Sequence, residues 1–373
     1  MKHELLQKLV LEFCKNYVEP EAARCDEEER FPIENVRKMG EYGLMGLIVP
    51  KELGGVGADY KAYIDTVRLL SRYCATTGTI LSAHVSLCIG PILQFGTEEQ
   101  KKKYVPSLAK GKKIGAFALT EAGAGSDASR QLTRAVLDND HYVINGNKIF
   151  ITNAAYADVF IVFAMTQPEL GTKGISAFIV DRKLPGFSIG AKEKKMGIRG
   201  SSTCELVLQN VLVPATNLLG KEGEGFKIAM ATLDSGRLGI ASQAQGIAEG
   251  AFEKTVAYVK KRQQFGKPIS ALQNTQFLLA ELATKIEAAS LLLYKGVSDK
   301  EAGKHYSSQA AMAKLFCSKT AVEVSDSAIQ LHGGYGYIRD FGIERYLRDA
   351  KITEIYEGTS EIQKLVIAGK VLK

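Results

Sequence analysis

The chain has 373 residues, of which 46% are hydrophobic and 24% are charged. This length suggests two or three domains, and the composition excludes a disordered, collagen-like or disulfide-stapled chain. The formal net charge of +7 comes from short basic clusters with acidic residues near most of them, which is typical of a solvated surface, with attraction for an anionic ligand as the alternative. The chain has 15 Tyr and 15 Phe but no Trp, which is unusual.

Apolar residues recur at helical spacing through the first third of the chain. Leu5, Leu9 and Phe13 begin this pattern, and 60–74 and 80–95 continue it. The glycine-rich sequence LGGVG (53–57) marks a loop between them. We therefore expect an α-helical N-terminal domain over residues 1–114.

From residue 115 onwards the pattern becomes that of strands. Val-, Ile- and Phe-rich runs of strand length cover 115–119, 142–144, 148–152, 159–165, 175–180 and 203–208. Asp138-Asn139-Asp140 predicts a turn, and Asn145-Gly146 predicts a two-residue hairpin. These features indicate an antiparallel β middle domain over residues 115–220.

The last part of the chain is helical again. Long amphipathic segments cover 226–261, 272–295, 307–331 and 362–372. They indicate a C-terminal helical bundle over residues 221–373. The fold class is therefore α+β and multidomain, in the order helices, sheet, helices.

Several classes of site and compartment can be set aside. No apolar run near 18 residues stands out, so we expect no membrane-spanning helix, and no Arg stripe with interleaved aromatics indicates nucleic acid. The six Cys residues lack a C-x-x-C spacing and have no His at ligand spacing, so we expect no metal site and a reducing compartment. The N-terminus lacks a signal or transit pattern, so we expect a cytoplasmic protein.

Four motifs carry candidate chemistry. LTEAGAGSDAS (119–129) contains G-x-G-x-x-A, but turns and strands follow it instead of a helix, so we reject a dinucleotide-binding βαβ unit there. Its glycines leave backbone N–H groups free to approach a phosphate or a ring edge. QLHGGYGY (330–337) fits either close helix packing or close approach to a ligand, RQQFG (262–266) fits a helix C-cap or an anion site, and YEGTS (356–360) places a lone Glu357 in a loop.

Taken in order, these motifs resemble the acyl-CoA dehydrogenase family from end to end. The resemblance rests on LTEAGAGSD (119–127), FITN (150–153), LDSGR (233–237), RQQFG (262–266), QLHGGYGY (330–337) and YEGTSEIQ (356–363). The chain is most similar to bacterial short-chain, butyryl-CoA-type members. The resemblance implies a four-helix C-terminal bundle, a homotetramer, one non-covalent FAD per subunit and electron-transferring flavoprotein as the electron acceptor.

The resemblance also implies a reaction, the α,β-dehydrogenation of a short-chain acyl-CoA to the trans-2-enoyl-CoA. Glu357 would abstract the α-proton while flavin N5 accepts the β-hydride. The backbone N–H of Glu357 would hydrogen-bond the thioester oxygen. Some relatives carry the base at the position of Gly236, which has no side chain to act. The substrate-binding residues it implies are Ser126, Asp234, Ser235, Gly236, Arg237 and Gly358.

The FAD-binding residues implied by the resemblance come from several parts of the chain. Those lining the isoalloxazine are Phe117, Ala118, Leu119, Thr120, Glu121, Ala122, Gly123, Ala124, Gly125 and Ser126, with Phe150, Ile151 and Thr152 packed on the ring system. Those contacting the FAD of a neighbouring subunit are Arg262, Gln273, Gln330, Leu331, His332, Gly333 and Gly334. Those holding the subunit's own FAD are Thr359, Ser360 and Glu361. Phe150 stands where many relatives carry Trp, so we expect flavin packing to survive with an altered ring environment.

Three alternatives remain open within this resemblance: an enoyl-CoA reductase working in fermentation, an oxidase-like relative, and a catalytically silent flavin-bound scaffold. Retention of Glu357, Arg262, Gln330 and LDSGR argues against the scaffold. The segment 82–90 contains no Arg to pair with a second carboxylate, which disfavours a dicarboxylic substrate. Branched short acyl groups are not excluded.

Overall fold

The structure is a computed structural model that describes residues 2–372. Its N-terminal part is helical, as the apolar periodicity predicts. The helices are α1 (Lys2–Phe13), α2 (Glu19–Glu27), α3 (Ile33–Glu41), α4 (Tyr60–Tyr73), α5 (Ala75–Ser82), α6 (Gly90–Phe95) and α7 (Glu98–Ala109). A π-helical segment, Ala83–Ile89, joins α5 to α6, so that these elements form one continuous helical stretch.

The middle of the chain forms an eight-stranded sheet in the order β6-β7-β3-β2-β4-β5-β8, with β1 paired to β4. Its strands are β1 (Gly115–Ala118), β2 (Arg134–Asp138), β3 (His141–Thr152), β4 (Val159–Met165), β5 (Ile175–Asp181), β6 (Phe187–Lys192), β7 (Thr203–Pro214) and β8 (Leu218–Leu219). The prediction of an antiparallel sheet needs a correction, because β4 pairs with β1 and with β2 in parallel. The other pairings in this sheet are antiparallel.

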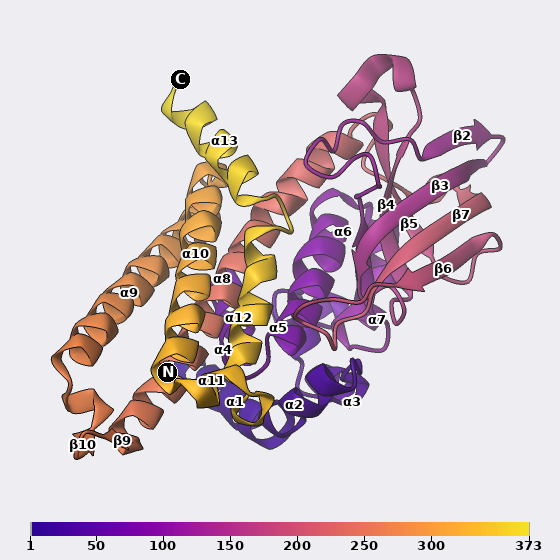
Figure 1. The fold of residues 1–373 in the computed structure, drawn as a ribbon. Coiled ribbons are helices and arrows are strands. Elements are labelled where there is room, and N and C mark those ends of the chain that lie inside the picture. Colours follow the sequence, from indigo (N-terminus) through magenta and orange to yellow (C-terminus); the bar gives the residue numbers. More distant parts are fainter. Residues whose placement is uncertain (1, 373) are drawn as a thin grey trace.

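The C-terminal part contains the long helices that the sequence predicts. These elements are α8 (Gly225–Lys261), a short hairpin of β9 (Gln263–Gln264) and β10 (Lys267–Pro268), α9 (Gln273–Glu301), α10 (Ser307–His332), α11 (Gly334–Tyr337), α12 (Glu344–Lys351) and α13 (Ser360–Val371). Helix α10 packs along α8, α9 and α13. Figure 1 shows the sheet on one side of the molecule, these helices on the other, and α4, α5 and α6 between them.

The burial of strand β4 shows that helices cover the sheet on both faces. Every residue of β4 is buried, so its unbroken apolar run suits a strand that is covered on both sides. Phe160 and Val162 belong to the larger core, which also contains residues of α4, α8 and α10. Ile161 and Phe163 belong to a second core with residues of α6, α7 and the start of α8. The sheet is therefore joined to both helical regions by apolar packing.

The hairpin predicted at Asn145-Gly146 is wrong. Both residues lie inside β3, where a register shift between Ile144 and Gly146 marks a bulge against β7. A Cβ on Gly146 would lie 2.5 Å from the Thr133 side-chain oxygen, so glycine serves close approach rather than a chain reversal. The turn predicted at Asp138-Asn139-Asp140 does join β2 to β3, with Asn139 at a φ of 52°.

The segment Ala75–Phe95 corrects a second expectation. It is long and apolar enough to cross a membrane by length and composition, with a mean hydropathy of 1.4 over its most apolar window. However, 78% of that window is buried inside the protein, and the packing shows why the segment is apolar. It is the central helical stretch between the sheet and the C-terminal helices (Figure 1). The domain boundaries at 114/115 and 220/221 stay predictions.

Candidate active site

Glu357 lies in a strained turn between the last short helical turn, Ile352–Glu354, and α13. Glu357 has a φ of 52° and Gly358 has a φ of 93°, so two successive residues are left-handed. For a residue with a side chain this conformation costs about 1–2 kcal/mol, and it persists only where the surroundings fix it. Thr359 ends the turn as the N-cap of α13, because its hydroxyl accepts the N–H of Ile362.

Two buried donors fix this turn through its carbonyl groups. The Gln363 amide donates from Nε2 to the carbonyl of Gly358 at 2.7 Å and to that of Glu357 at 3.3 Å. The Lys314 ammonium, on α10, donates to the same Gly358 carbonyl at 2.7 Å. Both lone pairs of that carbonyl are thus occupied. The backbone of the turn is held from two different helices.

The Glu357 carboxylate points toward Gly236 of α8. Its Oε2 atom is inaccessible to solvent and has no hydrogen-bond partner within residues 2–372, although the residue as a whole is only half-buried. A Cβ at position 236 would collide with Oε2 and would lie 2.9 Å from Leu87 Cδ2. Glycine at 236 is therefore what gives the carboxylate its space, and the two positions considered for the base face the same point.

This environment changes the acidity of Glu357. Burial raises the pKa of Glu357 to about 7, and the positive charges of Lys314 and Arg237 oppose that rise. A carboxyl group with a pKa near neutrality can both accept and return a proton at physiological pH. The geometry and the electrostatics together make Glu357 a candidate general base.

The predicted substrate-binding pair Asp234 and Arg237 lies one turn apart on α8, next to Gly236. Arg237 donates to Asp234 Oδ1 at 2.6 Å, and its side chain is only 6% exposed. Ser307 also donates to Asp234, while the Nε of Arg237 has no partner in the part of the chain that the structure describes. One donor of a buried guanidinium therefore stays free beside the candidate base.

Ser235 leads to residues that the sequence reasoning missed. Its hydroxyl lies 2.9 Å from the Tyr306 hydroxyl and accepts a hydrogen bond from Lys300 Nζ at 2.8 Å. Tyr60 of α4 donates to the Ser235 carbonyl at 2.9 Å. The ammonium of Lys300 also lies 4.6 Å from the centre of the Tyr60 ring. These contacts tie α4, α8 and α9 together at the LDSGR segment.

Tyr356, just before the base, is tied to α8 and through it to α5. Its hydroxyl donates to the Gln243 amide oxygen on α8, and the Gln243 amide donates to the Thr79 hydroxyl at 2.7 Å. Burial raises the pKa of Tyr356 far above its ordinary value, so its hydroxyl stays protonated and serves as a donor. The residue before Glu357 is thereby anchored by a buried polar chain.

The segment Phe117–Ser126 leaves β1 and forms an irregular loop over the sheet. Glu121 of this loop is buried and pairs with the fully buried Lys148 of β3, with Nζ 2.7 Å from Oε1. Lys148 donates in addition to the Gln131 side chain at 2.9 Å and to the Leu119 carbonyl at 3.1 Å. The Glu121 side chain thus holds the loop from inside, and only the backbone of this residue can face a ligand.

The outer part of the loop is open. An added Cβ at Gly123 or at Gly125 would meet nothing within 4 Å, and Ser126 is exposed. Leu119 and Ala124 are buried and anchor the loop, and Ala118 at the end of β1 is also buried. Phe117 packs on the buried Phe163, with ring centres 5.0 Å apart. The two glycines therefore leave backbone free for close approach by another molecule.

Phe150 is presented by a second irregularity in β3. The register between β3 and β7 shifts between Lys148 and Ile151, and Phe150 has a φ of 59°. A bulge re-aims side chains, and the Phe150 ring is 58% exposed while Ile151 is buried and Thr152 is half-buried. An exposed aromatic face in a strained position suits a stacking role.

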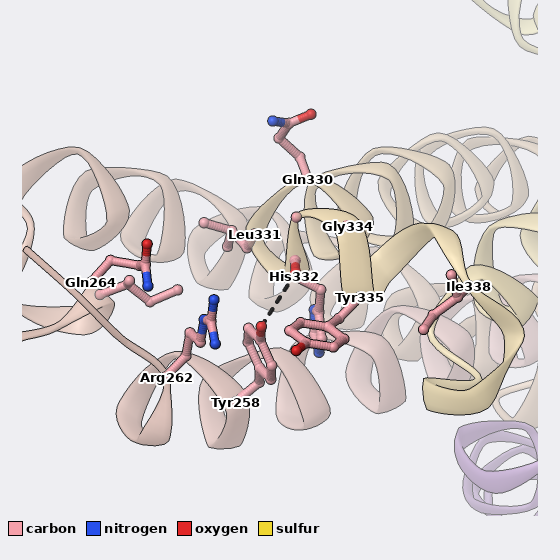
Figure 2. A pocket seen from close by; sticks show the side chains of 11 residues that line it. Tyr258, Arg262, Gln264, Gln330, Leu331, His332, Gly334, Tyr335 and Ile338 are labelled. Carbon is pink, nitrogen blue, oxygen red and sulfur yellow. Dashed lines mark hydrogen bonds between the residues drawn. The ribbon is translucent and has the colours of Figure 1, made fainter.

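A separate pocket of about 460 Å³ lies at the far end of α8 (Figure 2). It brings Arg262 together with the sequence Gln330–Gly334, which is 68 positions away. Tyr258 donates to the His332 carbonyl at 3.3 Å and stacks on its ring, with centres 4.1 Å apart. Burial lowers the pKa of His332, so its ring is neutral and belongs to the pocket wall. The Gln330 side chain extends away from Arg262 (Figure 2).

This pocket fits an anionic group such as a pyrophosphate. Gly333 has a φ of 60°, and an added Cβ at Gly333 or Gly334 would project into open space, so the backbone itself forms the wall. The Arg262 guanidinium lies over the Tyr335 ring at 5.4 Å and has no acidic partner among residues 2–372. The Gly333 N–H is bound to the Gln330 carbonyl at 3.1 Å, so the donors for an anion would be the Arg262 guanidinium and the uncovered backbone that begins at Gly334.

The predicted site residues lie mainly in three places. These are the turn of Glu357, the open surface formed by the loop 123–126 and Phe150, and the Arg262 pocket. Two predicted residues lie outside these places: Gln273 begins α9 outside the Arg262 pocket, and Glu361 is exposed. Ser360 closes the Glu357 turn, because its hydroxyl donates to the Glu354 carbonyl at 3.5 Å. Among residues 2–372 no cluster of His, Cys, Asp or Glu could hold a metal ion, and all six cysteines are free and buried.

The residues that the sequence reasoning missed include Lys148, Lys300, Tyr306, Lys314 and Gln363. One signal was available for Lys314. It lies three or four residues from Ala310, Ala311, Cys317 and Ser318, which are all buried, so it stands on a buried face of α10. A lysine on a buried helical face needs a partner, and that partner is the turn of Glu357.

Comparison with known families accounts for almost the whole chain. Sequence models of the acyl-CoA dehydrogenase N-terminal, middle and C-terminal domains match residues 1–112, 116–211 and 223–372. The chain is 56% identical over 372 residues to a short-chain specific acyl-CoA dehydrogenase of Clostridium acetobutylicum, covering 100% of this chain and 98% of that one. It is 50% identical over 376 residues to an acryloyl-CoA reductase (NADH) of Anaerotignum propionicum, covering 100% and 95%.

Solved structures agree. The chain superposes with a TM-score of 0.98 on butyryl-CoA dehydrogenase from Megasphaera elsdenii, at 47% identity and with coverage of 100% and 98%. The score is also 0.98, at 50% identity and the same coverage, for a chain in a structure described as the electron transferring flavoprotein of Acidaminococcus fermentans. An acyl-CoA dehydrogenase complexed with FAD from Bacillus anthracis gives 0.93 at 38% identity, covering 100% of this chain and 66% of the other.

Proposed function

The chain belongs to the acyl-CoA dehydrogenase family, whose members use FAD, and from this premise we propose that it oxidises a short-chain acyl-CoA to the trans-2-enoyl-CoA. In that reaction one C–H bond breaks at the α-carbon and another at the β-carbon, and a C=C bond forms between them. Bound FAD would supply the hydride acceptor for the β-hydrogen, through its N5. The α-proton goes to Glu357.

The observation that carries the proposal is the buried, unpartnered Oε2 of Glu357 facing Gly236. A thioester α-proton is a weak acid, so its base must be close, poorly hydrated and of raised pKa. Glu357 meets these conditions, because its Oε2 is inaccessible to water and its pKa is raised to about 7 by burial. The N–H of Glu357 belongs to the same fixed turn and would donate to the thioester oxygen as negative charge develops.

Three surfaces of the chain would hold the two ligands. Phe150 and the open glycines 123 and 125 would receive the ring system, with Ser126 at its border with the substrate. Arg262, Gly333 and Gly334 would bind a pyrophosphate, and the remaining residues of 330–334 would line the same pocket. Asp234, Ser235, Arg237 and Gly358 would line the path of the acyl-CoA.

We further propose a cytoplasmic homotetramer that passes electrons to an electron-transferring flavoprotein. Exposed apolar side chains support an interface along α9 and the β9–β10 hairpin: Phe265 is 90% exposed, Leu291 65% and Phe277 59%. The match to a chain in a structure of an electron transferring flavoprotein supports the electron acceptor.

A second candidate is the same chemistry in the opposite direction, reduction of a 2-enoyl-CoA. The 50% identity to an acryloyl-CoA reductase favours it. The same protons and hydride move in both directions, and the redox partner decides which direction prevails. The distinguishing measurement is the potential of the bound flavin with and without butyryl-CoA and crotonyl-CoA, together with the rate at which reduced flavoprotein or NADH re-reduces the flavin.

The test of the proposed function is an anaerobic titration of the purified FAD-loaded protein with butyryl-, isobutyryl-, octanoyl- and glutaryl-CoA. We expect bleaching of the flavin absorbance by the short straight chain, weaker bleaching by the branched chain, and none by the dicarboxylic substrate. The absence of bleaching by every thioester would overturn the proposal. Bleaching by octanoyl-CoA alone would overturn the short-chain assignment but leave the reaction standing.

A further inference from the structure

Lys314 is a buried ammonium ion whose charge has no partner in direct contact. Its side chain is 0% exposed, and its one hydrogen bond within residues 2–372 goes to the Gly358 carbonyl at 2.7 Å. No carboxylate of the described residues lies within ion-pair distance of it. A buried cation in this state is costly, so a merely structural position on α10 would favour an apolar side chain.

The partner of Lys314 is the turn that carries the proposed base. Gly358, whose carbonyl accepts from Lys314, follows Glu357 directly, and both residues have a positive φ. Relaxation of this turn to an ordinary backbone conformation would swing the carboxylate away from Gly236, because φ of Glu357 sets the direction of its side chain. Lys314 therefore holds an unfavourable backbone conformation in the orientation that chemistry requires.

Gln363 offers a natural comparison for Lys314. It donates to the same Gly358 carbonyl at 2.7 Å and is also 0% exposed, but it carries no charge. Gln363 and Lys314 thus share the mechanical role, and only Lys314 adds a positive charge next to Glu357. The charge stabilises the deprotonated carboxylate, whereas the hydrogen bonds fix its position.

Resting on the function proposed above, we propose that Lys314 is a positioning residue for proton abstraction: through the Gly358 carbonyl it holds Glu357 against Gly236, and its charge favours the ionised form of that carboxylate before it accepts the α-proton. Lys314 does not touch substrate. Its effect on the reaction passes entirely through the turn and the field at Glu357.

Other groups near the base cannot replace this charge. Burial raises the pKa of Glu357 and lowers that of Lys314 to about 8, while each charge favours the ionised form of the other. Arg237 of α8 is the second cation, but its charge is already paired with Asp234. The remaining titratable groups that face Glu357 are neutral hydroxyls whose pKa values burial raises: Tyr60 and Tyr63 of α4, and Tyr356 of the turn itself.

The experiment compares three variants of the FAD-loaded protein, Lys314→Gln, Lys314→Met and Gln363→Met, with Lys319→Met as an exposed control on the same helix. The rate of flavin bleaching by butyryl-CoA is measured from pH 5.5 to 9.5. Exchange of the methyl protons of acetyl-CoA in D₂O is followed by NMR as a second readout, since acetyl-CoA has α-protons but no β-carbon from which hydride could leave.

For Lys314→Gln we expect the acidic limb of both profiles to move up by about one pH unit, which is about a tenfold loss below pH 6.5, with a nearly normal rate at pH 9. For Lys314→Met we expect the same shift and a lower plateau. For Gln363→Met we expect a lower plateau and an unmoved limb. Lys319→Met should match the wild type.

An unmoved acidic limb in Lys314→Gln, with FAD still bound, would overturn the proposal. So would a shift of equal size in Gln363→Met, because that residue carries no charge. If Lys314→Met does not fold, the comparison of Lys314→Gln with Gln363→Met still tests the proposal. A wild-type protein that bleaches with no thioester and exchanges no α-proton would instead overturn the proposed function, and the two failures are distinct.

Discussion

Lys148 and Lys314 are both fully buried, but their surroundings differ in kind. Lys148, beneath the glycine-rich loop, meets the Glu121 carboxylate, the Gln131 amide oxygen and the Leu119 carbonyl at 2.7–3.1 Å. Lys314, beside the turn of Glu357, meets one carbonyl among the described residues and has no carboxylate in contact. The first site is a direct ion pair with its hydrogen bonds saturated, whereas Lys314 makes no direct ion pair with a described residue.

The difference shows how one chain uses a buried cation for two purposes. Where every donor and acceptor is satisfied, a buried ion pair can only fix structure, because any change leaves a charge unpaired. Where cation and carboxylate lie near each other without contact, the field between them still influences protonation, and the carboxylate keeps a free oxygen for chemistry. The saturated site holds a loop, and the unsaturated site holds a candidate base.

The variant with the largest expected effect at the second site is Glu357→Gln, which removes the charge of the free carboxylate and keeps the shape of the side chain. We expect FAD and thioester binding to persist and the rate of anaerobic bleaching to fall by about 10²–10⁴-fold, because a positioned base contributes about that much. Stopped-flow absorbance with butyryl-CoA measures the rate. Glu52→Gln is the control, since Glu52 is an exposed carboxylate in the short helical turn Lys51–Leu53, outside the site. Turnover of Glu357→Gln near the wild-type rate would show that the base lies elsewhere.

The same variant has a second, pH-dependent consequence for stability. Burial raises the pKa of Glu357 in the folded protein from its ordinary value to about 7. Ionising this carboxyl group is therefore less favourable in the folded protein than in the unfolded chain. Its contribution to stability is complete below the unfolded pKa and is lost as pH rises through about 7. The melting temperature of Glu357→Gln should therefore exceed that of the wild type by more at pH 8.5 than at pH 5. A difference independent of pH would contradict this assignment.

The next largest effect tests the saturated site. Lys148→Met leaves Glu121 charged and buried, so we expect a loss of about 3–5 kcal/mol of stability, seen as a lower urea midpoint and melting temperature. The double variant Lys148→Met with Glu121→Gln should recover part of the loss, because no unpaired charge remains. Lys102→Met, at an exposed position, is the control.

The pH dependence of this pair runs in the opposite direction from that of Glu357. Burial alone would raise the pKa of Glu121, but the charge and hydrogen bond of Lys148, with hydrogen bonds from Thr133 and Leu132, lower it overall. This stabilisation is present above the unfolded pKa and is lost as pH falls through the lower folded value. In Lys148→Met the deficit in melting temperature should therefore shrink under acid conditions. A deficit that stays constant down to pH 3 would argue against the ion pair as its cause.

Arg262 extends the comparison to a third cation, one that is unpaired but faces a pocket instead of the protein interior. We expect Arg262→Gln to weaken FAD binding by about 10–100-fold, because a hydrogen bond to a charged group is worth about 1.5–3 kcal/mol. Equilibrium dialysis with flavin fluorescence measures the affinity. Lys261→Gln, the exposed neighbour, should leave it unchanged. Equal affinity in Arg262→Gln would remove the pyrophosphate assignment of this pocket.

The sequence predicts much of the fold because its signals there are strong. The periodicity of α8 and α10 and the unbroken apolar run of β4 require burial, and burial decides the element. The missed elements lack such signals: β6 exposes much of its length, and α12 is short and rich in charge. Asn145-Gly146 resembles a turn in sequence, but β2 and β3 already turn at Asp138-Asn139-Asp140, and the glycine instead serves the close approach of Thr133, just before the paired strand β2.

The candidate site likewise contains residues that the sequence predicts and residues that it does not. Glu357, Gly236 and Arg262 lie in motifs that can be recognised in order, so sequence alone points to them. Gln363 lies in the same motif as Glu357, but its hydrogen bonds to the carbonyl groups of the turn cannot be read from the motif. Lys314 acts on Glu357 only because α10 packs against that turn, and no local pattern encodes this contact. Sequence identifies the groups that face a ligand, whereas the contacts that hold them in place become visible only in the folded structure.

The smallest expected effect concerns Phe150, two residues after Lys148 on the same bulge. Phe150→Trp adds ring area at a position that is 58% exposed, so it should fit without collision and change the bleaching rate by less than about threefold. Because the chain has no other Trp, the introduced indole is the sole source of tryptophan emission. If Phe150 packs on the flavin, FAD addition should quench that emission strongly. If the saturated Lys148 site fixes the bulge, quenching should disappear in combination with Lys148→Met even at saturating FAD, while Lys314→Gln should leave it intact. Quenching that survives Lys148→Met would show that the loop holds Phe150 in place without its buried ion pair.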